Sequence, residues 1–248
     1  MGCCFHAFQQ LFNNGNGIPL EMTPHWTQVV VLRSVGFEVY QRGRHPPRRK
    51  DKVNIVYDVA GNNHLGGQDF NERLRENLSA EIAAERGGLE LDDVEDVQSL
   101  RNAVEEAKLA LTYQNSTIIE LNLRLPVSLS ARHAIRKFRR VVSRQLFEQL
   151  NEDLFQKVLE PIDRVLDVAD LTAFDIDEIV LVGGSTRIPR IRQLIRGYFG
   201  GREPNVAIDP ELAVVTGISV QAGIVGGMWP LTVSAIEVPT SARKIHLH

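Results

Sequence analysis

The sequence contains very little cysteine, since Cys3 and Cys4 are the only cysteines among its 248 residues. Neighbouring cysteines rarely pair, because the short loop between them strains the disulfide geometry. A fold stapled by disulfides is therefore excluded. Hydrophobic residues make up 43% of the chain, enough for one large domain or two small ones, which excludes a chain that is disordered throughout.

An excess of basic charge is also missing. The formal net charge of -3 gives no global electrostatic reason to bind nucleic acid. Charged residues are absent from residues 212–236, a length that could span a bilayer, but the glycines, Gln221 and Pro230 favour a buried helix, a turn and a strand. The N-terminus has no basic leader before an apolar run. We therefore expect no nucleic-acid partner, no membrane span and no signal peptide.

Several common catalytic signatures do not occur. The sequence has no Gly-Lys-Ser/Thr of a P-loop and no G-x-G-x-x-G fingerprint. Its seven histidines show no zinc spacing, and no G-x-S-x-G elbow is present. Metal hydrolases and serine hydrolases are therefore disfavoured, and we predict no metal site.

Strands and helices alternate along the chain without an internal repeat, which predicts the α/β class. Residues 1–27 lack a sustained apolar period, so we predict a poorly ordered or divergent segment there, then a domain over residues 28–238 and a tail over 239–248. The expected elements are a hairpin of residues 28–33 and 37–40, a basic loop at 42–52, a strand at 53–59, a helix from 68 to the glycines at 87 and 88, a helix at 97–112, a strand at 116–123, a long helix at 141–168 with a kink at Pro161, a strand at 179–182, a helix at 188–195, a helix after Asp209-Pro210 and a strand at 231–238.

Two glycine pairs, Gly66-Gly67 and Gly183-Gly184, lie at strand-to-helix turns. Open α/β sheets bind ligands at such turns, because backbone N–H groups converge there and the missing side chain lets a ligand approach. By spacing alone, glycines that only make a tight turn are the more common case.

Three segments of the chain favour a ligand-binding role for these glycines over a simple turn. They are residues 61–74 (GNNHLGGQDFNERL), 150–155 (LNEDLF) and 179–189 (IVLVGGSTRIP). With these motifs in this order, the chain resembles the heat-shock 70 kDa family over residues 53–238. Its finer detail is similar to a microsomal member that consists of the ATPase core alone. That detail is carried by Asn62, Asn63, Gln68, residues 213–217 (AVVTG) and residues 229–231 (WPL).

The resemblance implies the two-lobed actin-like ATPase (ribonuclease H-like) fold, of which the matched region is mainly the second lobe. It also implies ATP or ADP as the ligand, with Mg²⁺ expected only in a complete two-lobed protein. The implied nucleotide-binding residues are Gly66 and Gly67 toward the phosphates, Glu105, Lys108 and Thr112 toward the ribose, Gly183, Gly184, Ser185 and Arg187 against the adenosine, and Glu211 near the base. The planar guanidinium of Arg187 would stack on the purine. Without the resemblance, Glu105 and Lys108 read equally well as an exposed i,i+3 ion pair.

The chain departs from the family pattern at three places. Leu109 stands where the family has an arginine that closes the adenine sandwich, and Gln68 stands where many members have a glutamate near the metal. The second lobe's phosphate loop, Asp-Leu-Gly-Gly-Gly-Thr, has only a degraded candidate at residues 33–36 (RSVG). No counterpart of the first lobe is expected, so we predict no catalytic residue and no ATP hydrolysis by this chain alone.

These features leave alternative functions open. The first is the nucleotide-binding core of a heat-shock 70 kDa-type chaperone, truncated so that it lacks the first lobe and the peptide-binding domain. The second is a non-catalytic interaction module or pseudo-ATPase with co-chaperones or ubiquitin-like adaptor proteins as partners. A sugar kinase of the same general fold is disfavoured, because the matching residues are those of the chaperones. The resemblance implies the endoplasmic reticulum or microsomes as the compartment.

Overall fold

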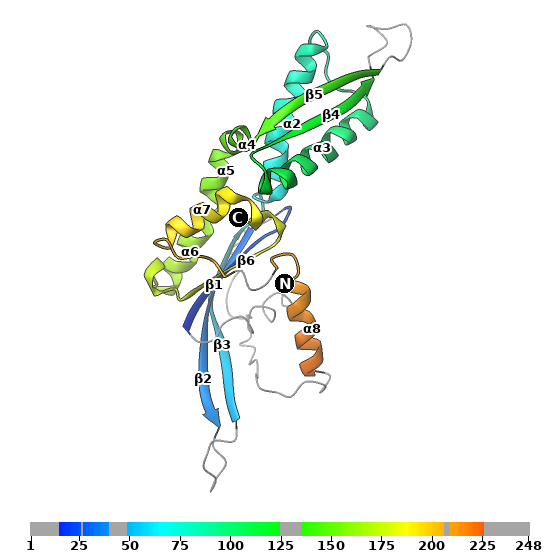
Figure 1. The fold of residues 1–248 in the computed structure, drawn as a ribbon. Helices are drawn as coiled ribbons and strands as arrows, with labels where there is room; N and C mark the ends of the chain where they lie inside the picture. Colours follow the sequence, from blue (N-terminus) through cyan, green and yellow to red (C-terminus); the bar gives the residue numbers. More distant parts are fainter. Residues whose placement is uncertain (1–14, 26, 40–48, 125–134, 206–208, 226–248) are drawn as a thin grey trace. The chain divides into compact units, whose positions relative to one another are not determined.

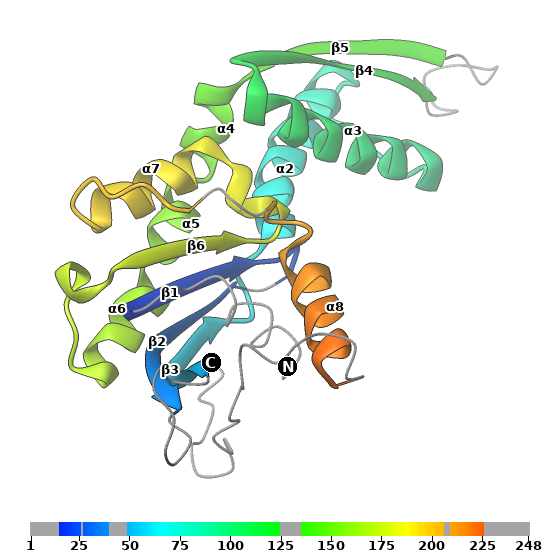
Figure 2. The ribbon, with the colours of Figure 1, turned by 60° about the horizontal axis from the view of Figure 1, so that its bottom comes forward.

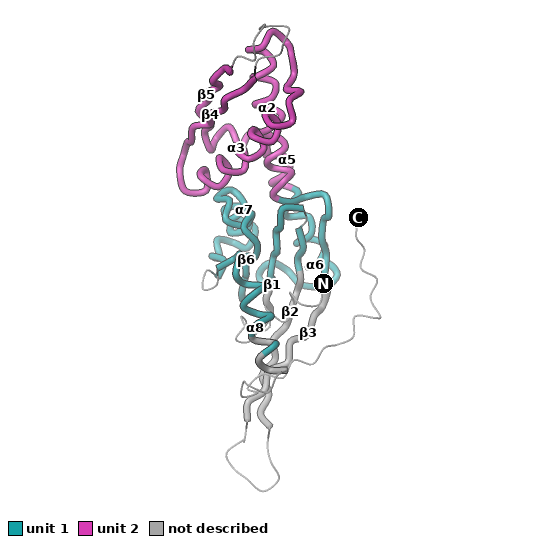
Figure 3. The backbone as a smooth tube through the Cα atoms, turned by 90° about the vertical axis from the view of Figure 1, so that its right-hand side faces the viewer, with its two compact units in different colours: residues 1–66, 157–248 teal, residues 67–156 magenta. Residues whose placement is uncertain are grey.

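The computed structural model describes residues 15–25, 27–39, 49–124, 135–205 and 209–225 (Figure 1). The chain divides into two compact units, coloured separately in Figure 3. Unit 1 combines Met1–Gly66 with Lys157–His248, and unit 2 is Gly67–Gln156. Each unit has its own sheet and its own buried apolar side chains.

Unit 1 is built on a four-stranded sheet with the order β3-β2-β1-β6 (Figure 2). The strands are β1 (Gly15–Met22), β2 (Thr27–Val39), β3 (Arg49–Asn62) and β6 (Glu178–Val182). The pairs β1–β2 and β2–β3 are antiparallel, whereas β6 runs parallel to β1. Strands β1, β3 and β6 therefore run in one direction and end at the same edge of the sheet, which we term the carboxyl edge.

Three α-helices accompany this sheet. They are α6 (Glu160–Ala169), α7 (Pro189–Tyr198) and α8 (Ala213–Val225), with the short 3₁₀ helices η1 (Ala173–Asp175) and η2 (Gly184–Arg187). Helix α6 packs against β2 and β3 and buries Ile162, Val165 and Leu166. Both α6 and α7 carry proline in their first turn, where no N–H is needed for the helix.

Unit 2 combines helices with a two-stranded antiparallel sheet. Its elements are α2 (Gly67–Glu85), α3 (Val94–Tyr113), β4 (Ser116–Arg124), β5 (Ile135–Ser143), α4 (Arg144–Leu150) and α5 (Glu152–Lys157). Helix α3 packs against β4, and α2 packs against α3 and α4. Alternate residues of β4, namely Ile119, Leu121 and Leu123, are buried, as expected for a strand with one face in the core.

Local signals explain where the two long helices of unit 2 begin and end. Helix α2 buries Phe70, Leu74, Leu78 and Ile82, every fourth residue, and the glycines at 87 and 88 that follow it both have positive φ. The side chain of Asp93 caps α3 by accepting hydrogen bonds from the N–H groups of the residues at 95 and 96. The two helices predicted from residue 68 and at 97–112 are confirmed within a few residues. So are the strands predicted at 116–123 and 179–182 and the helix after Asp209-Pro210.

The folded part begins earlier than the sequence predicted. Strand β1 lies inside residues 1–27, and its Ile18, Leu20 and Met22 are almost fully buried. The prediction of a poorly ordered segment is therefore wrong for residues 15–25. Residues 1–14 lie outside the described residues.

The predicted hairpin of residues 28–33 and 37–40 is also wrong, because residues 27–39 form the single strand β2. Gly36 suggested a turn, but it stays in the ladder opposite Lys52. The predicted basic loop at 42–52 overlaps β3 from Arg49 onward. Residues 33–36 thus lie within a paired strand and form no phosphate loop.

The long helix predicted at 141–168 is instead the end of β5 followed by α4, α5 and α6. Ser143 caps α4, because its hydroxyl accepts the N–H of Leu146. Asn151 ends α4, and its fully buried amide donates to the carbonyl of Phe147 at 2.9 Å. The predicted strand at 231–238 and the tail at 239–248 lie outside the described residues.

Within the described ranges, no helix is both long enough and apolar enough to cross a membrane. Within the uncharged segment of residues 212–236, Ala213–Val225 form α8, a helix of 13 residues, and residues 226–236 lie outside the described residues.

Candidate functional site

Three chain segments meet at the carboxyl edge of unit 1. They follow β1 (Thr23–His25), β3 (Asn63–Gly66) and β6 (Gly183–Arg187). Ligands of open α/β sheets bind at this kind of edge. The second glycine pair and one residue of the first therefore lie where the sequence placed a ligand.

Gly183 brings the third segment close to β1. Its φ is 85°, and a Cβ on this residue would lie 2.2 Å from the carbonyl oxygen of Met22, so no other residue fits here. Its N–H donates to the carbonyl of Pro210 at 2.8 Å, and its own carbonyl accepts the hydroxyl of Thr186 at 2.7 Å. Gly183 thus joins β1, η2 and the segment before α8.

The charged residues at this turn are Arg187, Asp209 and Glu211, which we term the arginine cluster. Arg187 Nη2 lies 2.6 Å from Asp209 Oδ1 and 3.7 Å from Glu211 Oε2. Glu211 also lies against Gly184, because a Cβ on that glycine would come within 2.7 Å of Glu211 Oε1. The structure therefore brings together five predicted site residues: Gly183, Gly184, Ser185, Arg187 and Glu211.

Asp209 organises the arginine cluster. Its Oδ1 accepts the backbone N–H of Glu211 at 2.9 Å in addition to the guanidinium of Arg187. These two donors, the N–H of Glu211 first, hold the pKa of Asp209 below its usual range. Asp209 therefore stays ionised and fixes both the turn before α8 and the position of Arg187.

Gly66 lies against the turn that joins β1 and β2. A Cβ on Gly66 would lie 2.4 Å from the carbonyl oxygen of Pro24 and 2.5 Å from the nitrogen of His25. The buried hydroxyl of Thr27 donates to the carbonyl of Leu65 at 2.7 Å and holds the two segments together. The space that the missing side chain leaves is thus occupied by the protein's own backbone.

A second group of predicted residues lies in unit 2, on α2 and α3. Lys108 Nζ donates to Glu105 Oε2 at 2.8 Å and to the carbonyl of Gly67 at 3.3 Å. Asn71 of α2 donates to the same carboxylate oxygen of Glu105 at 2.5 Å. Lys108 is only 8% exposed, so the pair is more than an ion pair on the surface.

Two further residues of α3 complete the description of this group. The hydroxyl of Thr112 donates to the carbonyl of Lys108 at 3.3 Å, one turn back along its own helix. The side chain of Leu109 is 54% exposed. The roles of Gly67, Glu105, Lys108 and Thr112 toward a nucleotide remain predictions from the family resemblance.

Protonation of Glu105 should remove its contribution to stability at low pH. Burial raises the pKa of Glu105, but the hydrogen bonds from Lys108 and Asn71 outweigh burial and leave this pKa below its ordinary value. A lowered folded-state pKa gives stability that is complete above the unfolded pKa, about 4.3, and is lost as the pH falls through the folded value.

We therefore expect Glu105→Gln to lower the free energy of unfolding at neutral pH by about 0.5–1 kcal/mol, because solvent screens the pair. The side chain of Glu105 is 44% exposed. The difference between variant and wild type should begin to shrink below the unfolded pKa, about 4.3, and disappear once the pH has fallen through the lower folded-state pKa. Urea unfolding at several pH values measures it, and a difference that grows as the pH falls would contradict this assignment.

Three contributors to these groups were missed at the sequence level. Asp209 was used only to predict the start of the helix that follows it, and no spacing rule links it to Arg187. Asn71 faces Glu105 from another helix, so only packing reveals the contact. The backbone of Pro24 and His25 was missed because β1 was not predicted.

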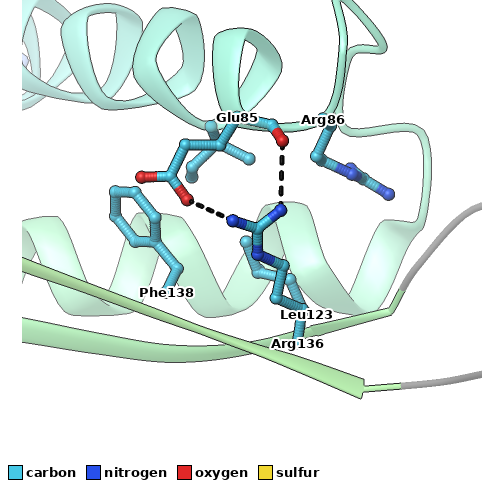
Figure 4. A pocket seen from close by; sticks show the side chains of 6 residues that line it. Glu85, Arg86, Leu123, Arg136 and Phe138 are labelled. Carbon is cyan, nitrogen blue, oxygen red and sulfur yellow. Dashed lines mark hydrogen bonds and ion pairs between the residues drawn. The ribbon is translucent and has the colours of Figure 1, made fainter.

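Figure 4 shows a small hollow in unit 2 lined by Ile82, Glu85, Arg86, Leu123, Arg136 and Phe138. Arg136 donates to the backbone carbonyl of Glu85 at 3.1 Å and to its carboxylate at 3.3 Å. The hollow has a volume of about 10 Å³, which is room for one water molecule and not for a nucleotide. In the part of the chain that the structure describes, no three His, Cys, Asp or Glu side chains are grouped to hold a metal ion.

Comparison with known proteins gives consistent matches. Heat shock 70 kDa protein 13 of Mus musculus is 45% identical over 216 residues, which covers 73% of this chain and 45% of the mouse protein. The Homo sapiens protein of the same name is 44% identical with the same coverage. Heat shock 70 kDa protein BIP3 of Oryza sativa subsp. japonica is 43% identical over 176 residues, covering 69% of this chain and 25% of the rice protein. The chain thus spans less than half the length of these relatives.

A family model described as Hsp70 protein matches residues 51–237. This range includes the three segments that carried the resemblance, and that prediction is confirmed. Because the match covers most of the chain, the chain belongs to the Hsp70 protein family, and its mixed α/β fold is the actin-like ATPase fold of that family.

Proposed function

We propose that this chain is an adenine-nucleotide-binding core of Hsp70 type, in which unit 1 binds the base at its carboxyl edge. Strand β1 belongs to this core, so its folded part includes residues before 28. ATP hydrolysis requires cationic and metal groups that stabilise the transferred phosphoryl group. In the described residues, the Arg187 guanidinium at this edge is bound to two carboxylates, so we propose binding without turnover.

The arginine cluster is the observation that carries this proposal. Arg187 belongs to η2, next to the glycine pair, and its side chain is 31% exposed. Asp209 holds one guanidinium nitrogen and so fixes the plane of the group, the part of an arginine that stacks on a purine. The Glu211 carboxylate fills the space beside the adjacent Gly184, and Ser185 is 8% exposed, so Arg187 is the residue that carries the proposal.

Replacing Arg187 by alanine should weaken adenine-nucleotide binding by about 1–2 kcal/mol, or roughly 5–30-fold in Kd, the scale of a partly desolvated cation–π contact. Isothermal titration calorimetry with the full chain measures the change. The matched control is Arg192→Ala, which removes the same charge from an exposed position on α7. Equal affinities of the two variants for nucleotide would refute the role of Arg187.

A non-catalytic interaction module is the second candidate function. It is favoured by the backbone of Pro24 and His25, which occupies the space beside Gly66. Co-chaperones or ubiquitin-like adaptor proteins would then be the partners. The same titration separates the candidates, because such a module needs no nucleotide and its heat signal should stay at the level of buffer.

A further inference from the structure

Four backbone positions at the carboxyl edge of unit 1, namely Pro24, His25, His64 and Gly183, offer no free N–H group. Pro24 has no N–H, and the N–H of His25 donates to the Thr23 hydroxyl at 3.3 Å. The N–H of His64 donates to Asn62 Oδ1 at 2.9 Å, and that of Gly183 donates to the carbonyl of Pro210. Phosphate sites depend on several N–H groups that converge on the anion. At these positions the donors are absent or already used inside the fold.

The lack of space beside Gly66 also argues against a phosphate site. A glycine admits a phosphate when its open side faces the ligand. The open side of Gly66 instead faces Pro24 and His25 at 2.4–2.5 Å, and Gly66 is buried. Neither a phosphate nor a methyl group fits into that space.

The other end of the edge is acidic. The carboxylates of Asp209 and Glu211 share one guanidinium, that of Arg187, so the arginine cluster carries a net negative charge. Glu211 lies directly against Gly184 at the start of η2. This end of the edge therefore gives the phosphates no alternative site, because a phosphate group here would meet like charge, whereas a neutral nucleoside would not.

From these three observations we infer that the chain recognises the nucleoside and gains no affinity from the phosphates. The ligand class is thus a purine nucleoside, free or as the nucleoside part of a nucleotide. Arg187 stacks on the base, and the turn of Thr23–His25 takes the place of a phosphate-binding loop. This inference rests on the proposed function, since it presupposes that unit 1 binds adenosine.

The test is a calorimetric titration of the full chain with adenosine, AMP, ADP and ATP, each with and without Mg²⁺. We expect the four dissociation constants to agree within about threefold. ADP or ATP binding at least about tenfold more tightly than adenosine would overturn the inference and leave the proposed function intact. If none of the four ligands binds, the proposed function fails and the inference fails with it.

A charge variant supplies a second readout, the ratio of ATP affinity to adenosine affinity. Glu211→Gln removes one negative charge beside Gly184 and should strengthen ATP binding relative to adenosine by about two- to fivefold at low salt. The gain should shrink as salt is added, because the repulsion is screened. A ratio of ATP to adenosine affinity that stays unchanged in the variant counts against the inference.

Discussion

Gly183→Ala should destabilise unit 1 by about 3–5 kcal/mol, as the sum of backbone strain and overpacking. Gly183 has φ 85° and ψ 145°, a conformation that residues with a side chain rarely adopt. Its new methyl group would also lie 2.2 Å from Met22 O, which is backbone and cannot rotate away. Relief of the clash requires β1 and β6 to separate, although the two strands are paired along their length.

Two other glycines of unit 1 separate the contributions to this effect. Gly201 has φ 90° but open space around its Cβ position, so Gly201→Ala should cost only the strain, about 1–2 kcal/mol. Gly197 lies in α7 with open space and an ordinary φ, so Gly197→Ala should stabilise by about 0.5–1 kcal/mol. Urea unfolding of the three variants measures the series. Equal effects at 183 and 201 would show that β1 does not approach Gly183.

The elements predicted well from the sequence have local signals. The four-residue spacing of α2 and the glycines that follow it identify the helix without knowledge of its partners. Strand β1 shows an alternation of Ile18, Leu20 and Met22, but it is short and contains Pro19 and Glu21. What makes it a strand is pairing with β2 and with β6 far along the chain. This pairing is a feature of the tertiary structure, so the local sequence of β1 does not show it.

The break in the helix predicted at 141–168 also depends on tertiary contacts. Apolar residues continue at helical spacing through residues 146–162, so the period gives no sign of an end. Asn151 ends α4 by turning its amide back to Phe147, and it also donates to the carbonyl of Phe70 on α2 at 3.4 Å. A contact with another helix therefore decides the boundary.

The candidate site could be predicted in part for similar reasons. The glycine turn and Arg187 come from one contiguous motif, residues 179–189, and the structure keeps them together with Glu211. Asp209 stands 22 residues from Arg187, and only the folded chain shows that the two are paired. The turn at Pro24 and His25 could not be placed, since it depends on β1.

Phe155→Ala should destabilise unit 2 by about 3–5 kcal/mol, because it removes a core ring and leaves a cavity. The side chains of Phe155 on α5 and Phe70 on α2 are both fully buried, and their rings stack with centroids 4.9 Å apart. The stacked pair adds about 0.5–1.5 kcal/mol beyond area burial. The carbonyl of Phe70 also accepts the amide of Asn151, so movement of the ring disturbs the end of α4.

The prediction is tested by amide exchange of the α2 backbone, which reports opening of unit 2, together with urea unfolding. Phe155→Leu keeps most of the apolar volume and should cost less, about 1–2 kcal/mol, which separates loss of packing from loss of the fold. The control is Tyr113→Ala at the end of α3, where the ring is 75% exposed and the expected change stays within about 0.5 kcal/mol. If Phe155→Ala changes exchange in α2 no more than Tyr113→Ala does, the two rings do not share a core, and the packing of α5 on α2 described above is wrong.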